Sequence, residues 1–527
     1  MATFGDLRSA GALSRRYQGA GRHRGPASTL VLPKPPNDEE KYLYIHRNLF
    51  FLATTMVIGA STVIISQVDF ESHNPLPWPF VVFTVTFFLY QVVSLPVNFT
   101  GIGFDLAAHE LRVRTWNPVW YPSVDIYLPI CGEPIPVLRN TWAAVAALVA
   151  RYGGVARPYV LDDGDDPQAA RLAAEFGFSY WVRPRPGEQK KSGNLRYAFA
   201  RTPGEFIVIL DADFAPRRDL LSETLPYMAD PAIAIVQTPQ YFRGSRRQTW
   251  IERSAGAIQE VFYRSVQVAR DRFGEAICVG TSAVYRRAAL EPQGGPTLIP
   301  YAEDVHTGLD VRRAGWKMIY LPILLSAGIC PDNLDAFVRQ QYRWCTGNAG
   351  VLFSERLWSV PMSVPARLSY LSGFLYYAYT GLLTFFGPII PIVMLVFLPH
   401  DIRLRNFLVL IPAVLTAFIL YPLWHRSRYG PTVWPLGLAR GWAHVFAITD
   451  SARGKTMGSH PTRTPGGSLR RFRIWVTAWS GGLAVAWAAL AIWRTLAYGS
   501  QFAIVLAFGL FNLAVVGRVV FPGKRTA

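Results

Sequence analysis

Four short motifs in the middle of the chain carry side chains of the types that bind metals, phosphates and sugars. Each motif is short enough to recur by chance. Their common order along the chain predicts a single active site, and the apolar segments on either side place that site at a membrane. The motifs are Leu161-Asp162-Asp163-Gly164, Asp211-Ala212-Asp213, Ala302-Glu303-Asp304 and Gln340-Gln341-Tyr342-Arg343-Trp344.

Asp211 and Asp213 follow an apolar run, residues 205–210, that is typical of a buried strand. In an extended segment their i, i+2 spacing would place both carboxylates on one side of the chain. Two carboxylates beside a diphosphate suit Mg²⁺ or Mn²⁺, because these cations prefer oxygen ligands and leave positions for phosphate and water. The alternative is a pair of turn or helix-capping aspartates.

Two further acidic motifs have a chemical and a structural interpretation. Asp162 and Asp163 end a strand-like run, where their carboxylates would accept hydrogen bonds from a nucleoside, and the alternative is an ordinary Asp-Gly turn. Glu303 and Asp304 open a helical segment. Asp304 would act there as a general base on a sugar hydroxyl, whereas an acid in a first helical turn often only interacts with the helix dipole.

The motif at residues 340–344 is the most specific of the set. Arg343 offers a planar donor fork for a diphosphate, Gln340 a neutral donor, and Trp344 a flat face on which a pyranose can stack. The alternative is an amphipathic helix at the membrane surface, with Trp344 as an interfacial anchor. The two interpretations are compatible if the acceptor is bound at the boundary between the cytosol and the bilayer.

The composition differs from that of a soluble protein. Of 527 residues 51% are hydrophobic and 17% are charged, and the net charge is +18. Residues 425–473 contain nine Arg or Lys and one acid, Asp450, beside apolar segments, as the positive-inside rule describes. No nucleic-acid-binding motif accompanies this charge, so we expect membrane lipids as partners and no nucleic acid. The four cysteines have no Cys-x-x-Cys spacing, so neither a zinc site nor a disulfide framework is indicated.

Six apolar segments are long enough to cross a bilayer as helices, which predicts a multi-pass protein of the plasma (inner) membrane. The first connection holds Asp69 and Glu71 but no Lys or Arg, which places it outside and the middle region in the cytoplasm. We predict a disordered basic tail at 1–46, two transmembrane helices in 47–104, a cytosolic domain at 105–355, and interfacial helices with four transmembrane helices in 356–527. We expect neither a cleavable signal peptide nor a C-terminal regulatory domain. The six segments are residues 48–67, 78–100, 372–398, 406–424, 474–494 and 499–520.

The region 105–355 alternates strand-like and helical patterns. Such alternation predicts a parallel α/β sheet, in which ligands collect at the carboxyl ends of the strands. The carboxylate motifs fall at those ends. The predicted strands are residues 124–130, 157–161, 205–210 and 232–236, and the predicted helices between them include 136–151 and 166–176.

With these motifs the chain resembles the processive, cellulose synthase-like branch of the family 2 glycosyltransferases, over about residues 120–350. Further matching elements are Lys191-Ser192-Gly193-Asn194, Val236-Gln237-Thr238-Pro239 and the loop at 280–284. The resemblance implies a GT-A-like α/β domain inserted between about six transmembrane helices. It also implies an inverting UDP-sugar-dependent hexosyltransferase that extends a β-linked polysaccharide and exports it through the membrane.

The resemblance also implies roles for individual residues. Asp304 would be the catalytic base, and Asp211 and Asp213 would hold Mg²⁺ or Mn²⁺. The nucleotide would be bound by Glu133, Asp162, Asp163, Lys191, Asp211, Gln340 and Arg343. The acceptor would be bound by Trp344, Glu303, Gly280 and Thr281.

UDP-glucose is the favoured donor and a cellulose-like glucan the favoured product, with an accessory export subunit as a further partner. Ala302, Val279 and Cys131 depart from the family pattern, so UDP-N-acetylglucosamine or GDP-mannose remains an alternative donor. Two further alternatives are a non-processive lipid glycosyltransferase, and a transporter or scaffold with an inactive transferase domain. The gating loop that covers the site in relatives is expected within residues 425–473, at 446–449 or 457–462.

Overall fold

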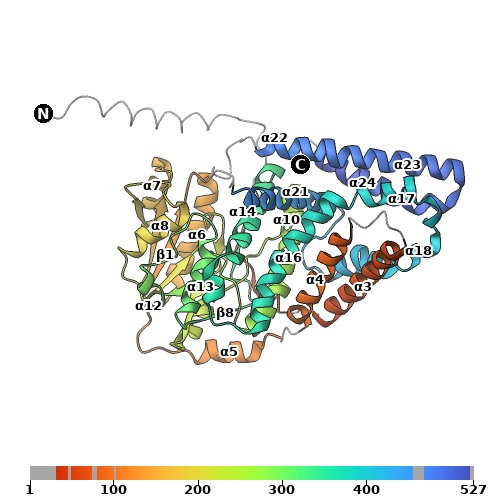
Figure 1. Ribbon diagram of the computed structural model, residues 1–527. Coiled ribbons are helices and arrows are strands. Elements are labelled where there is room, and N and C mark those ends of the chain that lie inside the picture. Colours follow the sequence, from red (N-terminus) through yellow and green to blue (C-terminus); the bar gives the residue numbers. More distant parts are fainter. Residues whose placement is uncertain (1–30, 46–48, 74–79, 100–102, 455–467, 523–527) are drawn as a thin grey trace.

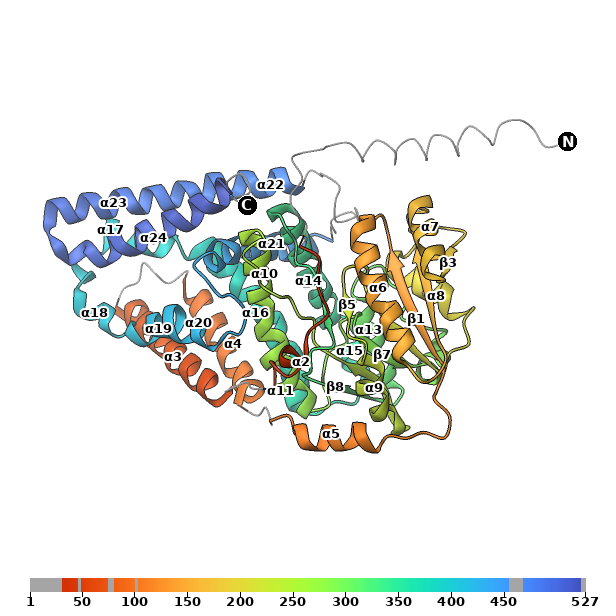
Figure 2. The same cartoon turned by 180° about the vertical axis from the view of Figure 1, so that it is seen from behind.

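The computed structural model describes residues 31–45, 49–73, 80–99, 103–454 and 468–522. An α/β domain forms one end of the molecule, and long helices from both ends of the chain form the other (Figure 1). Viewed from behind, α10, α16 and α21 lie between these two parts (Figure 2). The predicted insertion of an α/β domain between apolar helices agrees with this arrangement.

The α/β domain is built on a seven-stranded sheet of order β3-β2-β1-β4-β7-β6-β8. The pairs β2–β3, β1–β2, β1–β4 and β6–β8 are parallel, whereas β7 is antiparallel to both of its neighbours. The predicted mostly parallel sheet with flanking helices is confirmed. The strands are β1 (Val124–Ile130), β2 (Ala156–Asp162), β3 (Ser179–Val182), β4 (Phe206–Ile209), β6 (Ile233–Gln237), β7 (Ala283–Arg286) and β8 (Lys317–Tyr320).

Helices cover both faces of this sheet because successive side chains of a strand point to opposite faces. From β1, Ile126 and Leu128 pack with α6 (Ile135–Arg151) and α7 (Pro167–Phe176). Tyr127 belongs to the opposite core, with α8 (Lys190–Phe199). The central strands are therefore buried on both faces, which explains their continuous apolar sequences.

Helices also join the α/β domain to the apolar helices. α10 (Trp250–Val261) passes through a π-helical turn at residues 262–266 into α11 (Gln267–Arg272), and α13 (Glu303–Arg313) precedes β8. α14 (Leu334–Leu352) packs against both α21 (Val433–Ala452) and α16 (Val364–Phe386). The motif at 340–344 therefore lies on a helix between the two parts of the molecule.

The prediction of six membrane spans is not confirmed. All six apolar segments are helical, but among the described residues only Phe50–His73, Arg470–Tyr498 and Ser500–Val520 are long and apolar enough to cross a bilayer. A fourth span results if α16 and α17 (Ile389–Phe397), which are bent by 41° at Gly387 and Pro388, count as one. Two shorter apolar helices, Val81–Ser94 and Ile411–Trp424, account for the remaining segments.

The segment 425–473, expected to contain a gating loop, is largely helical where the structure describes it. Residues 446–449, one candidate for that loop, lie inside α21, and Phe446 is only 4% exposed. Asp450 at the end of α21 accepts hydrogen bonds from Tyr342 of α14 and from Arg471 of α22 (Ser468–Trp475). The other candidate, residues 457–462, lies outside the described residues.

Residues 31–45 are ordered against the α/β domain, which corrects the prediction that the whole tail to residue 46 is disordered. The short helix α2 (Asp38–Lys41) has a capping box formed by Asn37 and Glu40. Glu40 also pairs with Arg243, and the backbone carbonyl of Lys41 accepts a hydrogen bond from Leu324. Residues 1–30 lie outside the described residues.

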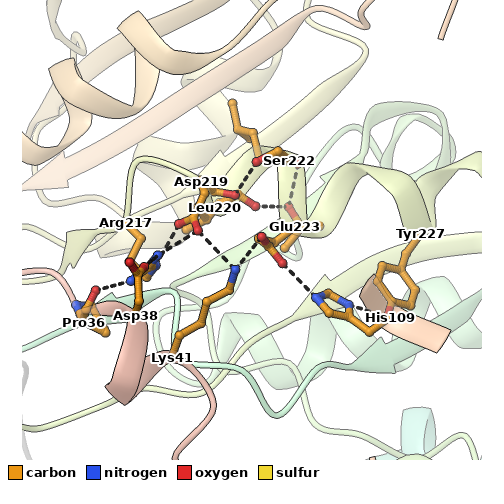
Figure 3. A network of polar contacts seen from close by, with 12 residues as sticks. Pro36, Asp38, Lys41, His109, Arg217, Asp219, Leu220, Ser222, Glu223 and Tyr227 are labelled. Atoms are coloured by element: carbon orange, nitrogen blue, oxygen red, sulfur yellow. Dashed lines mark hydrogen bonds and ion pairs between the residues drawn. The ribbon is translucent and has the colours of Figure 1, made fainter. Parts of the chain in front are cut away.

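A buried polar network holds α2 in place (Figure 3). Lys41 Nζ lies 2.5 Å from Glu223 Oε1 and 3.2 Å from Asp219 Oδ2. Glu223, on α9 (Leu220–Thr224), also contacts His109 Nε2 at 2.8 Å, and His109 belongs to α5 (Leu106–Thr115). Arg217 pairs with Asp38 and Asp219. The network thus ties the segments that flank α3 (Leu49–His73) and α4 (Val81–Phe99) to the same helix of the α/β domain.

Candidate active site

The predicted site residues converge on one edge of the sheet because of strand direction. The parallel strands β1, β2 and β4 end at this edge, where Asp162 is the last residue of β2 and Glu133 and Asp211 follow β1 and β4. Since β7 runs antiparallel to β4, the loop before it arrives at the same edge. That loop carries Gly280 and Thr281.

Asp211 and Asp213 lie in a tight turn after β4, not in the extended segment that was predicted. The turn is closed by a 3.0 Å hydrogen bond from the Phe214 N–H to the Asp211 carbonyl. The Asp211 N–H donates to Thr281 Oγ1 at 2.9 Å. Thr281 is 0% exposed, so it fixes the position of Asp211 and presents no surface to an acceptor.

The carboxylates at this turn repel one another. Burial, together with the neighbouring Asp211 and Glu133, raises the pKa of Asp213 to about 7. Glu133 comes from the loop after β1, where its Oε2 accepts a 2.6 Å hydrogen bond from the Cys131 N–H. A bound cation would relieve this repulsion.

Lys191 of α8 is the cation that the structure places among these acids. Its Nζ lies 2.5 Å from Asp211 Oδ1, 2.8 Å from the Gly280 carbonyl and 4.0 Å from Glu303 Oε1. Burial alone would lower the pKa of Lys191, but Asp211 and Glu303 raise it. Lys191 therefore stays charged and links the metal-binding candidates to the start of α13.

Asp304 sits in the first turn of α13 against the loop before β7. A Cβ added at Gly280, whose φ is +73°, would lie 2.9 Å from Asp304 Oδ2. Any other residue at position 280 would displace this carboxylate, which gives Gly280 a specific role. Burial and the adjacent Glu303 raise the pKa of Asp304 to about 7, in the range of a general base that works near neutral pH.

Asp162 and Asp163 are engaged within the domain. Asp162 accepts hydrogen bonds from the Gly164 N–H at 2.6 Å, the Asp166 N–H at 2.9 Å and the Tyr180 hydroxyl at 2.6 Å, as in the turn interpretation. Asp163 forms a bidentate pair with Arg183 at 2.6 and 2.7 Å. The nucleotide contacts predicted for Asp162 and Asp163 stay a prediction, and both carboxylates are held in place by these hydrogen bonds.

Arg343 of the α14 motif lies close enough to Glu303, at the start of α13, to interact with its charge. Among the described residues Arg343 makes no hydrogen bond or ion pair, and burial lowers its pKa while Tyr301 and Glu303 raise it. Gln340 has a buried Oε1 without a hydrogen-bond partner, and Trp344 is 36% exposed. A Cβ added at Gly347 would lie 3.0 Å from that of Ala302, so α14 packs directly against the start of α13.

Sequence reasoning missed three residues of the site, which are Arg183, Lys190 and Tyr301. Arg183 holds Asp163, and Lys190 places its Nζ 3.5 Å from the centre of the Tyr301 ring. Burial lowers the pKa of Lys190, and the nearby positive charge of Arg343 lowers it in addition, so the two cations share this region. Lys190 stands directly before Lys191, and this basic pair was the available signal.

No group of three or more His, Cys, Asp or Glu side chains in the described part of the chain is arranged to enclose a metal ion. Asp211 and Asp213 nevertheless fit a divalent cation that takes its remaining ligands from a diphosphate and water, because they are adjacent oxygen donors with excess negative charge.

Known proteins share this domain. The family model "Glycosyl transferase family group 2" matches residues 206–421. Cellulose synthase 1 of Komagataeibacter xylinus is 34% identical over 261 residues, which are 49% of this chain and 17% of that protein. The cellulose synthase catalytic subunit [UDP-forming] of Xanthomonas axonopodis pv. citri (strain 306) is 29% identical over 296 residues, 55% of this chain and 40% of that protein. The chain thus spans less than half the length of these relatives.

Among solved structures, a mannosyltransferase from Pyrobaculum calidifontis in complex with GDP-Man and Mn²⁺ is similar over 83% of this chain and 99% of that one. Its sequence identity is 14% and the TM-score is 0.39. Glucosyl-3-phosphoglycerate synthase from Mycobacterium tuberculosis covers 50% of this chain and 86% of its own, with 17% identity and a TM-score of 0.32.

Proposed function

We propose that this chain, a family 2 glycosyltransferase of the cellulose synthase-like type, polymerises a nucleotide sugar into a β-linked polysaccharide at the cytoplasmic face of the plasma membrane. UDP-glucose is the favoured donor and a cellulose-like glucan the favoured product. The observation that carries the proposal is the contact set of Lys191, which joins Asp211 to the loop and helix that hold Asp304.

The chemistry follows from these positions. Asp304 removes the proton from an acceptor hydroxyl, and the resulting oxygen attacks the anomeric carbon from the side opposite the diphosphate. The bond between that carbon and the diphosphate oxygen breaks, so an α-linked donor gives a β-linked product. Burial of Asp304 supports the role of base, because a carboxylate with a raised pKa accepts a proton more readily near neutral pH.

The leaving diphosphate needs positive charge. Arg343 and Lys190 share the region around Tyr301, and Arg343 is free of ion pairs among the described residues. Asp211 and Asp213 would hold Mg²⁺ or Mn²⁺, which when bound stabilises charge on the leaving group. The nucleotide would contact Glu133 and the Asp163–Arg183 pair.

The acceptor end is proposed to rest on α14. Trp344 offers a partly exposed indole face one residue after Arg343, which suits a terminal pyranose ring stacked close to the diphosphate. α14 packs against α16 and α21, so an extended chain would leave the site toward the apolar helices. Export through these helices is part of the proposal.

The test is a donor comparison with the purified protein in lipid vesicles and Mg²⁺. Radiolabelled UDP-glucose, UDP-N-acetylglucosamine and GDP-mannose are supplied separately, and any insoluble product is digested with linkage-specific glycanases. We expect high-molecular-weight product from UDP-glucose that a β-glucanase degrades. If polymer forms from a different donor, the proposed sugar is wrong. If the product is an organic-soluble monosaccharide adduct, the protein adds a single sugar to a lipid and does not polymerise.

A further inference from the structure

A second cavity lies away from the candidate active site. It has a volume of about 420 Å³, which is large enough for a ligand of moderate size. Its walls come from the starts of α10 and α14, from α22 with the turn after it, and from the end of α24 (Ala503–Val520). None of the proposed catalytic or substrate-binding residues lines it.

The walls combine apolar and cationic groups. Trp250, Phe472 and Val519 are buried side chains that face the space. Arg518 stacks over the Trp250 ring, with its guanidinium carbon 5.2 Å from the ring centre, and makes no hydrogen bond or ion pair with any described residue. Arg473 is largely exposed and pairs only loosely with Asp335, at 3.7 Å.

The acids at the cavity do not neutralise Arg518. Asp335 is the partner of Arg473, and Asp332 accepts a 2.7 Å hydrogen bond from Asn333 at Oδ1. Two acids and two arginines line the cavity, and Arg518 is the arginine that has no ion-pair partner among the described residues; it lies beside an aromatic ring. An anionic ligand with an apolar portion complements this combination.

The cavity also lies where a membrane surface is expected. Arg473 and Arg518 are close to the ends of two candidate spans, Arg470–Tyr498 and Ser500–Val520, and these ends adjoin the α/β domain. Basic pockets between membrane helices on the cytoplasmic side are typical binding sites for anionic lipid headgroups. Free anions of the cytosol lack the acyl chains that would pack beside Val476 and Val520.

We propose that this cavity binds the headgroup of an acidic phospholipid, with the phosphate at Arg518 and Arg473. The inference rests on the membrane location in the proposed function, but not on the identity of donor or product. A bound headgroup would touch the first turn of α14 at Asp335, five residues before Gln340, or about 7.5 Å along the helix axis. The lipid would therefore support the helix that carries Gln340, Arg343 and Trp344.

The test is native mass spectrometry of the full chain released from membranes of phosphatidylcholine with increasing phosphatidylglycerol. We expect one retained phosphatidylglycerol per wild-type chain. Arg473→Gln/Arg518→Gln should weaken its retention by about 30-fold, since each surface cation contributes roughly a factor of five to anionic lipid binding. The matched control Arg151→Gln/Arg171→Gln removes two exposed charges from α6 and α7 and should leave retention unchanged.

A second variant, Thr477→Trp, keeps both arginines but fills the cavity, so it should also lose the lipid. It tests lipid binding independently if the arginine variant does not fold. Equal retention by wild type, the arginine variant and Thr477→Trp would overturn the proposal. Displacement of phosphatidylglycerol by excess inorganic phosphate would also overturn it, because the site would then select a soluble phosphate. These outcomes do not depend on whether the protein makes polymer.

Discussion

The buried network around Lys41 makes a strong prediction about stability. Lys41 and Glu223 are each 7% exposed, and Lys41 is the cation that Glu223 and Asp219 share (Figure 3). Lys41→Met keeps most of the side-chain volume but removes the charge. Loss of one partner from a buried ion pair typically costs about 3–5 kcal/mol, because the other charge remains desolvated.

We expect Lys41→Met to lower the free energy of unfolding by about 3 kcal/mol, at the lower end of this range. Glu223 keeps its contact with His109, and Asp219 keeps its pair with Arg217. For a domain of this size each kcal/mol lowers the melting temperature by roughly 2–4 °C, so a decrease of about 9 °C is expected at pH 7. Residues 31–45 should also become more susceptible to proteolysis in the variant.

The difference in melting temperature between wild type and Lys41→Met should depend on pH, and this dependence tests the role of the ion pair. Burial alone would raise the pKa of Glu223, but hydrogen bonds from His109 and Lys41 lower it below its ordinary value. The stabilisation is therefore complete above the ordinary carboxyl pKa and disappears as the pH falls through the lowered folded value. The difference between wild type and Lys41→Met should shrink below about pH 4.

The assay is thermal unfolding of the full chain in detergent, followed by intrinsic fluorescence at several pH values. Lys34→Met is the matched control, because Lys34 lies in the same segment and its side chain is exposed. A melting temperature for Lys41→Met within about 1 °C of wild type at pH 7 would refute the reasoning, since 3 kcal/mol corresponds to several degrees. An equal decrease of the melting temperature in Lys34→Met would show that the net charge of residues 31–45 determines the stability, and not the burial of Lys41.

Three further predictions concern the candidate active site. Arg343→Lys keeps the charge but removes the planar fork, so KM for the nucleotide sugar should rise about tenfold in steady-state kinetics, and an unchanged KM would exclude a diphosphate contact. Trp344→Ala removes the stacking face, worth about 1 kcal/mol, and should shorten the product measured by size-exclusion chromatography, whereas equal product length would argue against acceptor stacking there. Since burial and Glu303 raise the pKa of Asp304 to about 7, the base is increasingly protonated below that pH. The initial rate should therefore fall by roughly tenfold per pH unit below about pH 7 and level off above it, and a flat profile through this range would contradict the role of Asp304.

The central strands of the sheet were predictable because they are buried on both faces. The continuous apolar runs of β1, β2 and β4 have few competing interpretations. The strands β3, β7 and β8 were missed, since each has four residues and at least one end that is polar or charged. α21 was also missed, because the density of arginines around it suggested a loop.

Partners distant in the sequence account for the other differences. The tail was predicted to be disordered from its composition, whereas Lys41 is ordered by Glu223, 182 residues away. The ion pair of Asp163 with Arg183 was not predicted, because it depends on how β2 and β3 align. Motif order correctly predicted that Asp211, Lys191 and Asp304 lie in one region, but the hydrogen bond by which Thr281 holds Asp211 depends on the fold and has no signal in the sequence.

The measurement that tests the central claim most directly is the product made from UDP-glucose by wild type and by Asp304→Asn, each in lipid vesicles with Mg²⁺. Wild type should give long polymer from the first time points. Asp304→Asn should bind the nucleotide with similar affinity but make polymer at least about 100-fold more slowly, because the carboxamide cannot accept the proton. Polymer from Asp304→Asn at the wild-type rate, or a single-sugar adduct from wild type, would contradict the account.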